Sequence, residues 1–284
     1  MDSYIKLKTE QPNPSTEDID RKSAREIAEL INREDHTVAS AVHAATEEIA
    51  EAIDRYASVI SSGGRVFYCG AGTSGRIGLL DAAEILPTYG LENRVIGILA
   101  GGSDAMERAK EDAEDDPDAI AGQLRDVYSF GEKDLLIAIS ASGCAACVAG
   151  AVRYAKDAGA FTIAVTCNRK SDLIPLCDLS IVADVGPEVI LGSTRMKAGT
   201  AQKMILNMLS TGGMIRAGRV RGNRMAFMRP TNQKLVARAV RMIQDATGCD
   251  AETAENALRS CENVPAFAMD FIEKEKVEKE KEKI

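Results

Sequence analysis

Short, uninterrupted apolar runs alternate with longer segments of helical periodicity along most of this chain. Runs that are apolar throughout, rather than at every second position, indicate strands covered on both faces. Strands that alternate with helices favour a parallel sheet with right-handed crossovers. The sequence therefore predicts an α/β fold of three layers with five parallel strands, at residues 65–69, 94–99, 135–139, 161–165 and 179–183. Apolar spacing predicts helices over 21–33, 37–61, 74–86, 103–114, 144–157 and 195–215.

Both ends of the chain depart from this pattern. Pro12 and Pro14 oppose helix formation, so the first residues are expected to form an extended arm. After Pro230, two short helices are predicted over 232–247 and 251–261, and the last twelve residues, with five Glu and five Lys, are typical of a solvated or frayed helix end. We therefore expect an N-terminal arm over 1–20, a main domain over 21–229, a small helical domain over 230–270 and a charged tail over 271–284.

The composition of the chain argues against certain binding partners and indicates a cellular compartment. The net charge of −8 and the aromatic content of 4%, with no Trp, do not favour nucleic-acid binding. No apolar run reaches the roughly 18 residues that span a bilayer, and the polar N-terminal residues lack the apolar block of a signal peptide. The seven cysteines are then expected to be reduced thiols. These features predict a cytoplasmic protein with neither a nucleic-acid nor a membrane partner.

Two loops rich in Gly and hydroxyl side chains follow the first and third predicted strands. Glycines let backbone amides approach an anion, and the helix N-terminus after each loop adds a partial positive charge. Either loop alone could be a structural turn, but two at the carboxyl ends of neighbouring strands predict one shared phosphate site. The predicted ligands are Gly72, Thr73, Ser74, Ser140, Ser142 and Gly143.

The phosphate in such a site is better matched by a phosphosugar than by a nucleotide. The first loop, Gly70–Arg76, lacks the Lys-Ser/Thr pair of a Walker A loop, and Ser and Thr crowd the turn that a dinucleotide fingerprint requires. No adenine slot and no ribose-binding acid are evident in the sequence. We therefore expect a small-molecule sugar phosphate as the partner.

These loops and several longer blocks resemble SIS domains and, among them, N-acetylmuramic acid 6-phosphate etherases. The block Gly186–Lys203 is similar to a signature shared by these etherases and the glucokinase regulatory protein, and the resemblance runs from about residue 8 to about residue 265. It implies a homodimer with its site at the subunit interface. Further similar blocks are Thr9–Glu10, Ile31–Asn32, Leu80–Glu84, Pro87–Gly90, Ala100–Gly102, Ala113–Asp115, Asn207–Thr211 and Thr231–Asn232.

The resemblance also implies a reaction and its catalytic residues. The lactyl ether of N-acetylmuramic acid 6-phosphate would be cleaved by elimination and rehydration, giving N-acetylglucosamine 6-phosphate and D-lactate without a metal or cofactor. By resemblance, Glu114 is the base that removes the C2 proton, and Glu84 is the acid that protonates lactate. From the residues alone, Glu114 would belong to a solvated acidic cluster, and Glu84 would be a salt-bridged helix residue about as readily as a catalytic acid in an apolar environment.

Four more residues of the Gly186–Lys203 block are candidate ligands. Arg195 and Lys197 could neutralise the phosphate or the lactate carboxylate, including across the dimer, or could form an ion pair at the start of the long helix. Ser193 and Thr194 could contact the sugar or cap the same helix.

One stretch departs from the etherase pattern. Etherases usually follow the second loop with Arg-Thr-Pro, whereas this chain has two alanines between Cys144 and Cys147. Losing the Thr hydroxyl predicts phosphate binding weaker by about 1.5–3 kcal/mol. The change keeps open a non-catalytic sugar-phosphate sensor related to the regulatory protein. A further alternative is an aldose–ketose phosphate isomerase on the same fold, in which Glu84 would not be needed as an acid for a leaving group. The cysteine pair also permits a redox or metal role, because a helix N-terminus favours a thiolate.

Overall fold

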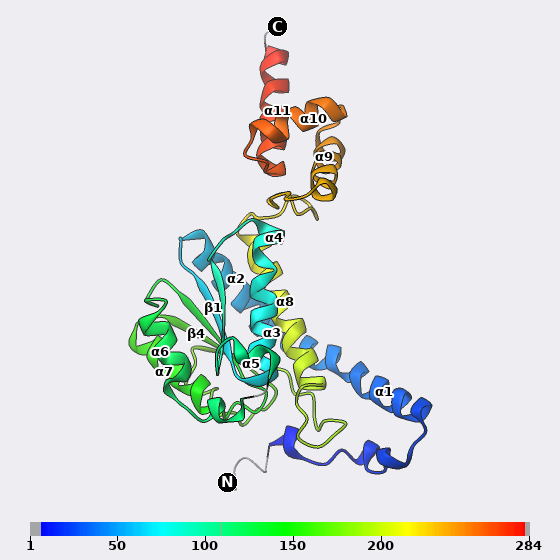
Figure 1. The fold of residues 1–284 in the computed structure, drawn as a ribbon, viewed down its shortest axis with the longest axis vertical. Coiled ribbons are helices and arrows are strands. Elements are labelled where there is room, and N and C mark those ends of the chain that lie inside the picture. Colours follow the sequence, from blue (N-terminus) through cyan, green and yellow to red (C-terminus); the bar gives the residue numbers. More distant parts are fainter. Residues whose placement is uncertain (1–6, 109, 282–284) are drawn as a thin grey trace. The chain divides into compact units, whose positions relative to one another are not determined.

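The structure, a computed structural model, describes residues 7–108 and 110–281 and is built on a five-stranded sheet (Figure 1). All strand pairs are parallel, in the order β2-β1-β3-β4-β5. In the centre, Val66 lies opposite Leu135 and Gly70 opposite Ile139. The five predicted strands and the parallel sheet are confirmed, as β1 (Val66–Gly70), β2 (Val95–Leu99), β3 (Leu135–Ile139), β4 (Phe161–Thr166) and β5 (Leu179–Val182).

Helices cover both faces of this sheet, which gives the predicted three layers (Figure 1). Phe67 belongs to the core beneath α6 and α7, whereas the hydroxyl of Tyr68, the next residue of β1, donates to Asp81 of α3 at 2.9 Å. Because successive side chains of β1 are buried on opposite faces, the strand is apolar throughout. One face is covered by α6 (Asp118–Asp126) and α7 (Ala146–Asp157), and the other by α2 (Thr46–Ser61), α3 (Gly72–Ala83) and α8 (Lys197–Arg216).

The N-terminal arm is folded back onto the sheet domain, so the prediction of an extended arm was wrong. Its described part forms three 3-10 turns, because its prolines exclude a long helix but allow short turns. The amide of Asn168 donates to the hydroxyl of Thr9 at 3.1 Å, and the hydroxyl of Thr16 donates to the carbonyl of Val189 at 2.8 Å. The turns are Lys8–Glu10, Pro14–Thr16 and Ile19–Arg21, and residues 1–6 lie outside the described residues.

The first long helix, α1 (Ala24–His43), continues through the break predicted near residues 34–36. A capping box between Ser23 and Glu26 starts it. The polar residues that suggested a break lie on partly exposed faces of the helix, where they do not interrupt it. The chain breaks instead just before α2, around Ala44 and Ala45.

Two predicted helices of the sheet domain are divided. The segment predicted as one helix over 103–114 contains α5 (Asp104–Glu107) and a 3-10 turn (Glu111–Glu114). The segment over 74–86 contains the end of α3 and the start of α4 (Ile85–Tyr89), with Glu84 between them. Helix α6 was not predicted, because its short amphipathic pattern follows an acidic stretch that ends in Pro117.

The chain divides into two compact units, one of residues up to 83 with 93–213 and the other of 84–92 with the residues from 214 onward. The second unit has its own core, which includes Met228, Ile243 and Leu258. Its helices α9 (Gln233–Thr247) and α10 (Ala251–Ser260) confirm the two predicted there. A third, α11 (Pro265–Lys281), extends into the predicted charged tail, because its first half buries apolar side chains in the same core. Residues 282–284 of that tail lie outside the described residues.

None of the helices described here is long and apolar enough to cross a bilayer.

Candidate functional site

A cavity of about 250 Å³ lies where β1 and β3 end. The segment after β1 leads to α3 on one face of the sheet, and the segment after β3 leads to α7 on the other face. Because the two connections leave in opposite directions, a crevice forms between them, as at the topological switch points of other open α/β sheets. The wall includes backbone and hydroxyl groups from both predicted phosphate loops, namely Gly72, Thr73, Ser74, Ser140 and Ser142. The cavity is roughly eight times the share of a water molecule in the liquid, about 30 Å³, which fits a phosphate with part of a sugar.

The second loop offers two hydroxyl donors. The backbone N–H of Gly143 donates to Ser140 Oγ at 3.0 Å, and that of Cys144 donates to Ser142 Oγ at 3.2 Å. The two Oγ atoms also lie 3.5 Å apart, so one hydroxyl can donate to the other while the remaining proton can be donated to an anion in the cavity. Gly143 shapes the turn rather than lining the cavity: its φ is 76°, and a Cβ atom there would lie 1.8 Å from Ser171 Oγ.

The first loop is held by α8. A Cβ atom on Gly199 would lie 3.4 Å from Thr73 Cγ2, so the first turns of α3 and α8 pack closely. Ser74 lies in the first turn of α3, with its Oγ 3.0 Å from Oε1 of Gln202. Gln202 is almost fully buried in α8, and sequence reasoning missed it because a polar residue within a helical pattern suggests an exposed position.

Glu114 lies on the wall of the same cavity. It ends the 3-10 turn Glu111–Glu114, which is anchored by Ala113 packing against the hydrophobic core beneath the sheet. Glu114 therefore lines the cavity while remaining exposed, like its acidic neighbour Asp115. A carboxyl group therefore lies beside the hydroxyls of both loops.

Glu84 lies at the opposite end of α3 from the phosphate loop. It follows the last of the 12 residues of this helix, and its side chain is exposed. At a rise of 1.5 Å per residue, the two ends of such a helix are about 17 Å apart. Glu84 is therefore separated from the first loop by the length of α3, and its role as the catalytic acid stays a prediction.

The segment before α8 contributes to the cavity through Gly192 and Thr194. The predicted ligand Ser193 lies between them and is half-buried, whereas Arg195 is exposed and does not line the cavity. Thr194, a candidate sugar ligand from the sequence, lines the cavity. The roles of Ser193 and Arg195 stay predictions.

The side chain of Lys197 forms a buried ion pair within the chain. Its Nζ lies 2.6 Å from Oε2 of Glu34, which also accepts a hydrogen bond from Asn13 at 2.9 Å. Burial of Glu34 alone would raise its pKa, but the hydrogen bonds from Lys197 and Asn13 outweigh this effect and hold the pKa below its ordinary value. A role of Lys197 as a phosphate ligand stays a prediction that would require this buried pair to open.

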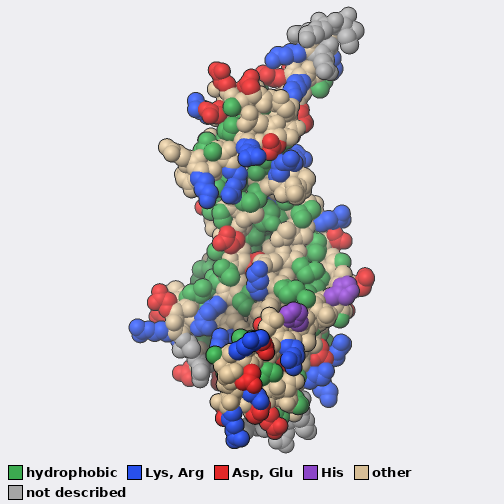
Figure 2. Space-filling model, turned by 90° about the vertical axis from the view of Figure 1, so that its right-hand side faces the viewer, with side chains coloured by type: hydrophobic (Ala, Val, Ile, Leu, Met, Phe, Trp, Pro, Cys, Tyr) green, Lys and Arg blue, Asp and Glu red, His purple; other side chains and the backbone are tan. Residues whose placement is uncertain are grey.

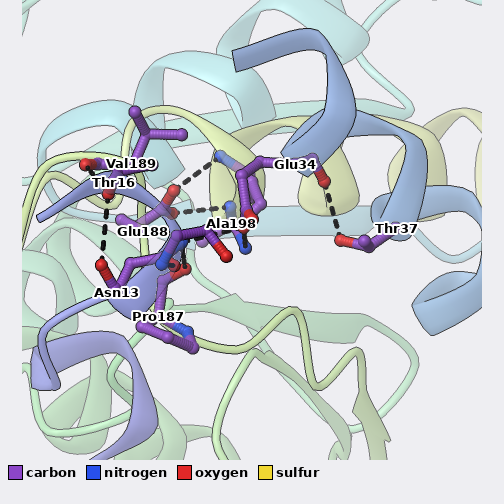
Figure 3. A network of polar contacts seen from close by, with 10 residues as sticks. Asn13, Thr16, Glu34, Thr37, Pro187, Glu188, Val189 and Ala198 are labelled. Carbon is purple, nitrogen blue, oxygen red and sulfur yellow. Dashed lines mark hydrogen bonds and ion pairs between the residues drawn. The ribbon is translucent and has the colours of Figure 1, made fainter. Parts of the chain in front are cut away.

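Glu188 caps α8 from within the same network (Figure 3). Its two carboxylate oxygens accept the backbone N–H groups of Lys197 and Ala198, each at 2.9 Å. Burial raises the pKa of Glu188 although these bonds act in the opposite direction. The network connects the N-terminal arm, α1 and the start of α8, and so it supports the segment that carries Gly192 and Thr194.

The two cysteines beside the second loop do not form a thiolate site. Burial raises the pKa of Cys147 to about 12, and the negative charge of Glu114 acts in the same direction. Burial also raises the pKa of Cys144. Desolvation therefore outweighs the helix N-terminus that favours a thiolate in the sequence. Within the described residues, no three His, Cys, Asp or Glu side chains gather closely enough to hold a metal ion.

The sheet order and the paired hydroxyl loops define a protein of the SIS-domain class. Residues 120–212 match the SIS domain family, and residues 48–156 match the glucokinase regulatory protein N-terminal SIS domain. A phosphoheptose isomerase from Francisella tularensis has a similar fold, with a TM-score of 0.54 and 20% identity, over 68% of this chain and 98% of that one. The solved structure of a protein of Escherichia coli CFT073 aligns with a TM-score of 0.52 and 22% identity, over 71% of this chain and 97% of that one.

Relatives with similar sequences indicate which family of SIS-domain proteins the chain belongs to. The N-acetylmuramic acid 6-phosphate etherase of Clostridium botulinum (strain Okra / Type B1) is 49% identical over 258 residues, covering 90% of this chain and 85% of that protein. The etherase of Lactobacillus acidophilus is 47% identical over 279 residues, covering 98% of this chain and 93% of that protein. The chain belongs to the N-acetylmuramic acid 6-phosphate etherase family. Membership of this family supports an enzyme, a carbon–oxygen lyase, over the alternative of a non-catalytic sensor.

Proposed function

We propose that the protein cleaves the D-lactyl ether of N-acetylmuramic acid 6-phosphate, giving N-acetylglucosamine 6-phosphate and D-lactate. The observation that carries this proposal is the presence of Glu114 on the wall of the cavity that both hydroxyl loops line. Phosphate bound by Ser74, Ser140 and Ser142 would hold C6 of the sugar at the strand ends. The remaining carbons of the open chain would then extend past Glu114.

In this mechanism Glu114 acts as the general base. The open-chain aldehyde at C1 acidifies the proton on C2, which the Glu114 carboxylate removes. The electron pair forms the C2–C3 double bond as the C3–O bond breaks, and lactate leaves once its ether oxygen receives a proton. Water then adds its hydroxyl to C3 and a proton to C2, which restores a saturated sugar.

The proton for lactate would come from Glu84 of a second copy of the chain in a homodimer. Glu84 is exposed in one chain, and Leu80, one helical turn earlier, is 52% exposed. On α8, the neighbour of α3, Met208 is 37% exposed. Figure 2 shows hydrophobic side chains gathered near the two histidines, which α1 carries. An apolar face that ends in a carboxylate suits a contact that buries the face and delivers the acid to a partner's cavity.

The same proposal includes a cytoplasmic location. All seven cysteines are free thiols, which a reducing compartment maintains.

The test is release of D-lactate from N-acetylmuramic acid 6-phosphate by the purified protein. Glu114→Gln keeps the shape of the side chain but removes the base, so release should fall by about 100-fold or more. Asp115→Asn is the matched control, because this exposed neighbour does not line the cavity. Absence of lactate with the unsubstituted protein, or equal rates for the two variants, would contradict the proposal.

A further inference from the structure

Gln202 is a buried amide next to the phosphate loop, and its NH₂ group makes no hydrogen bond in the described structure. Its side chain is 1% exposed, its Oε1 lies 3.0 Å from Ser74 Oγ, and its Nε2 is buried with no hydrogen-bond partner in the described structure. A buried donor without a partner costs about 1–3 kcal/mol. Such a group in a well-packed site calls for a functional explanation.

The position of this amide follows from the packing of two helices. Gly199 lets α8 approach Thr73 closely, and Gln202, almost one turn further along α8, then reaches Ser74. Ser74 is 8% exposed and lines the cavity, so its hydroxyl lies between the amide and the space for the ligand.

The orientation of the amide decides what Ser74 can offer to a phosphate. With Oε1 toward Ser74, the single hydroxyl proton of Ser74 is donated to Gln202, and the serine presents only lone pairs to the cavity. Lone pairs repel a phosphate dianion. A half-turn about the Cγ–Cδ bond brings Nε2 to the same position, where it donates to Ser74 Oγ and leaves the serine proton free.

We propose that Gln202 is a positioning residue that donates from Nε2 to Ser74 Oγ when phosphate is bound, so that the Ser74 hydroxyl donates to a phosphate oxygen. The half-turn gives Nε2 a partner in place of Oε1, and the Ser74 proton that it frees adds one charge-assisted hydrogen bond to the ligand. This role rests on the phosphate site of the proposed function, but not on the chemistry at C2 and C3.

The test is a double-mutant cycle on ligand affinity. Dissociation constants for inorganic phosphate and for N-acetylglucosamine 6-phosphate would be measured by calorimetry for the unsubstituted protein, Gln202→Met, Ser74→Ala and the double variant. Gln202→Met keeps the shape and removes the donor, so affinity should fall about tenfold. In the Ser74→Ala background the same change should alter affinity less than about twofold, because the group that Gln202 orients is gone.

Two controls separate positioning from general damage. Gln123→Met makes the same change on α6, where the amide bonds only its own helix, and should leave affinity unaltered. If Gln202→Met does not fold, Gln202→Leu replaces it in the same cycle, since this uncharged side chain also lacks the donor. Equal losses in both backgrounds would overturn the inference and leave the proposed function standing, whereas no phosphate binding by the unsubstituted protein would overturn both.

Discussion

The ammonium group of Lys197 and the carboxylate of Glu34 form a buried ion pair across 2.6 Å, with side chains 3% and 14% exposed. Lys197 begins α8, directly after the segment that lines the cavity, and Glu34 lies in the middle of α1. The pair therefore supports one side of the site from a helix that does not touch the cavity.

Glu34→Ala should destabilise the protein by about 3 kcal/mol, because it removes the hydrogen-bonded counter-ion of the buried Lys197 ammonium. Chemical denaturation of the variant measures this loss. The control is Glu29→Ala, which removes an exposed partner of Arg25 from the same helix and should change stability little. Equal stability of the two variants would show that the ion pair is not important for the fold.

The pair also predicts a dependence of stability on pH. The pKa of Glu34 lies below its ordinary value of 4.5, so the folded state binds this proton less readily than the unfolded state. The contribution of the pair is then fully present above pH 4.5 and is lost as the pH falls through the folded pKa. The stability advantage of the unsubstituted protein over Glu34→Gln should shrink as the pH falls below about 4.5. An advantage that is constant or grows toward low pH would contradict this sign.

The strands and the phosphate loops could be predicted because their causes are local. A strand buried on both faces needs an unbroken apolar run, as Leu135–Ile139 shows, and a loop that binds an anion needs glycines and hydroxyls at a strand end. The divided helix over 103–114 could not be predicted, since the packing of Ala113 against the distant α7 layer forms the turn that places Glu114.

Partners far apart in the sequence explain the other differences. Lys197 looks like a phosphate ligand in a phosphate-binding motif, but its partner Glu34 lies 163 residues away. Gln202 gains its position only because Gly199 brings α8 against α3. A single sequence does not reveal either pairing, because it offers many possible partners for a charged or amide side chain and only the fold determines which of them are close.

Ala145→Thr should strengthen phosphate binding. Ala145 lines the cavity at the residue before α7, at the position of the threonine in the usual etherase pattern. A hydroxyl there would donate to phosphate and improve affinity about tenfold. It could also cap α7, whose present cap has no side-chain hydrogen bond. Ala145→Val is the control because it has the shape of Thr without the hydroxyl, and equal affinities of the two variants would exclude the hydroxyl as the cause.

Glu84 and Glu114 should complement each other between subunits. If each cavity combines its own Glu114 with Glu84 of the partner, a mixed dimer of Glu84→Gln and Glu114→Gln chains holds one intact site and one site with both changes. Such a dimer, co-expressed and purified through two different tags, should release lactate at roughly half the rate of the unsubstituted dimer, although each parent variant is inactive. If both glutamates serve a site within one chain, every site of the mixed dimer is defective and no activity returns. The control is a mixed dimer of a Glu84→Gln chain with a chain that carries both changes, because it has no intact site in either arrangement. Lactate release by this dimer would show that the activity comes from a contaminant.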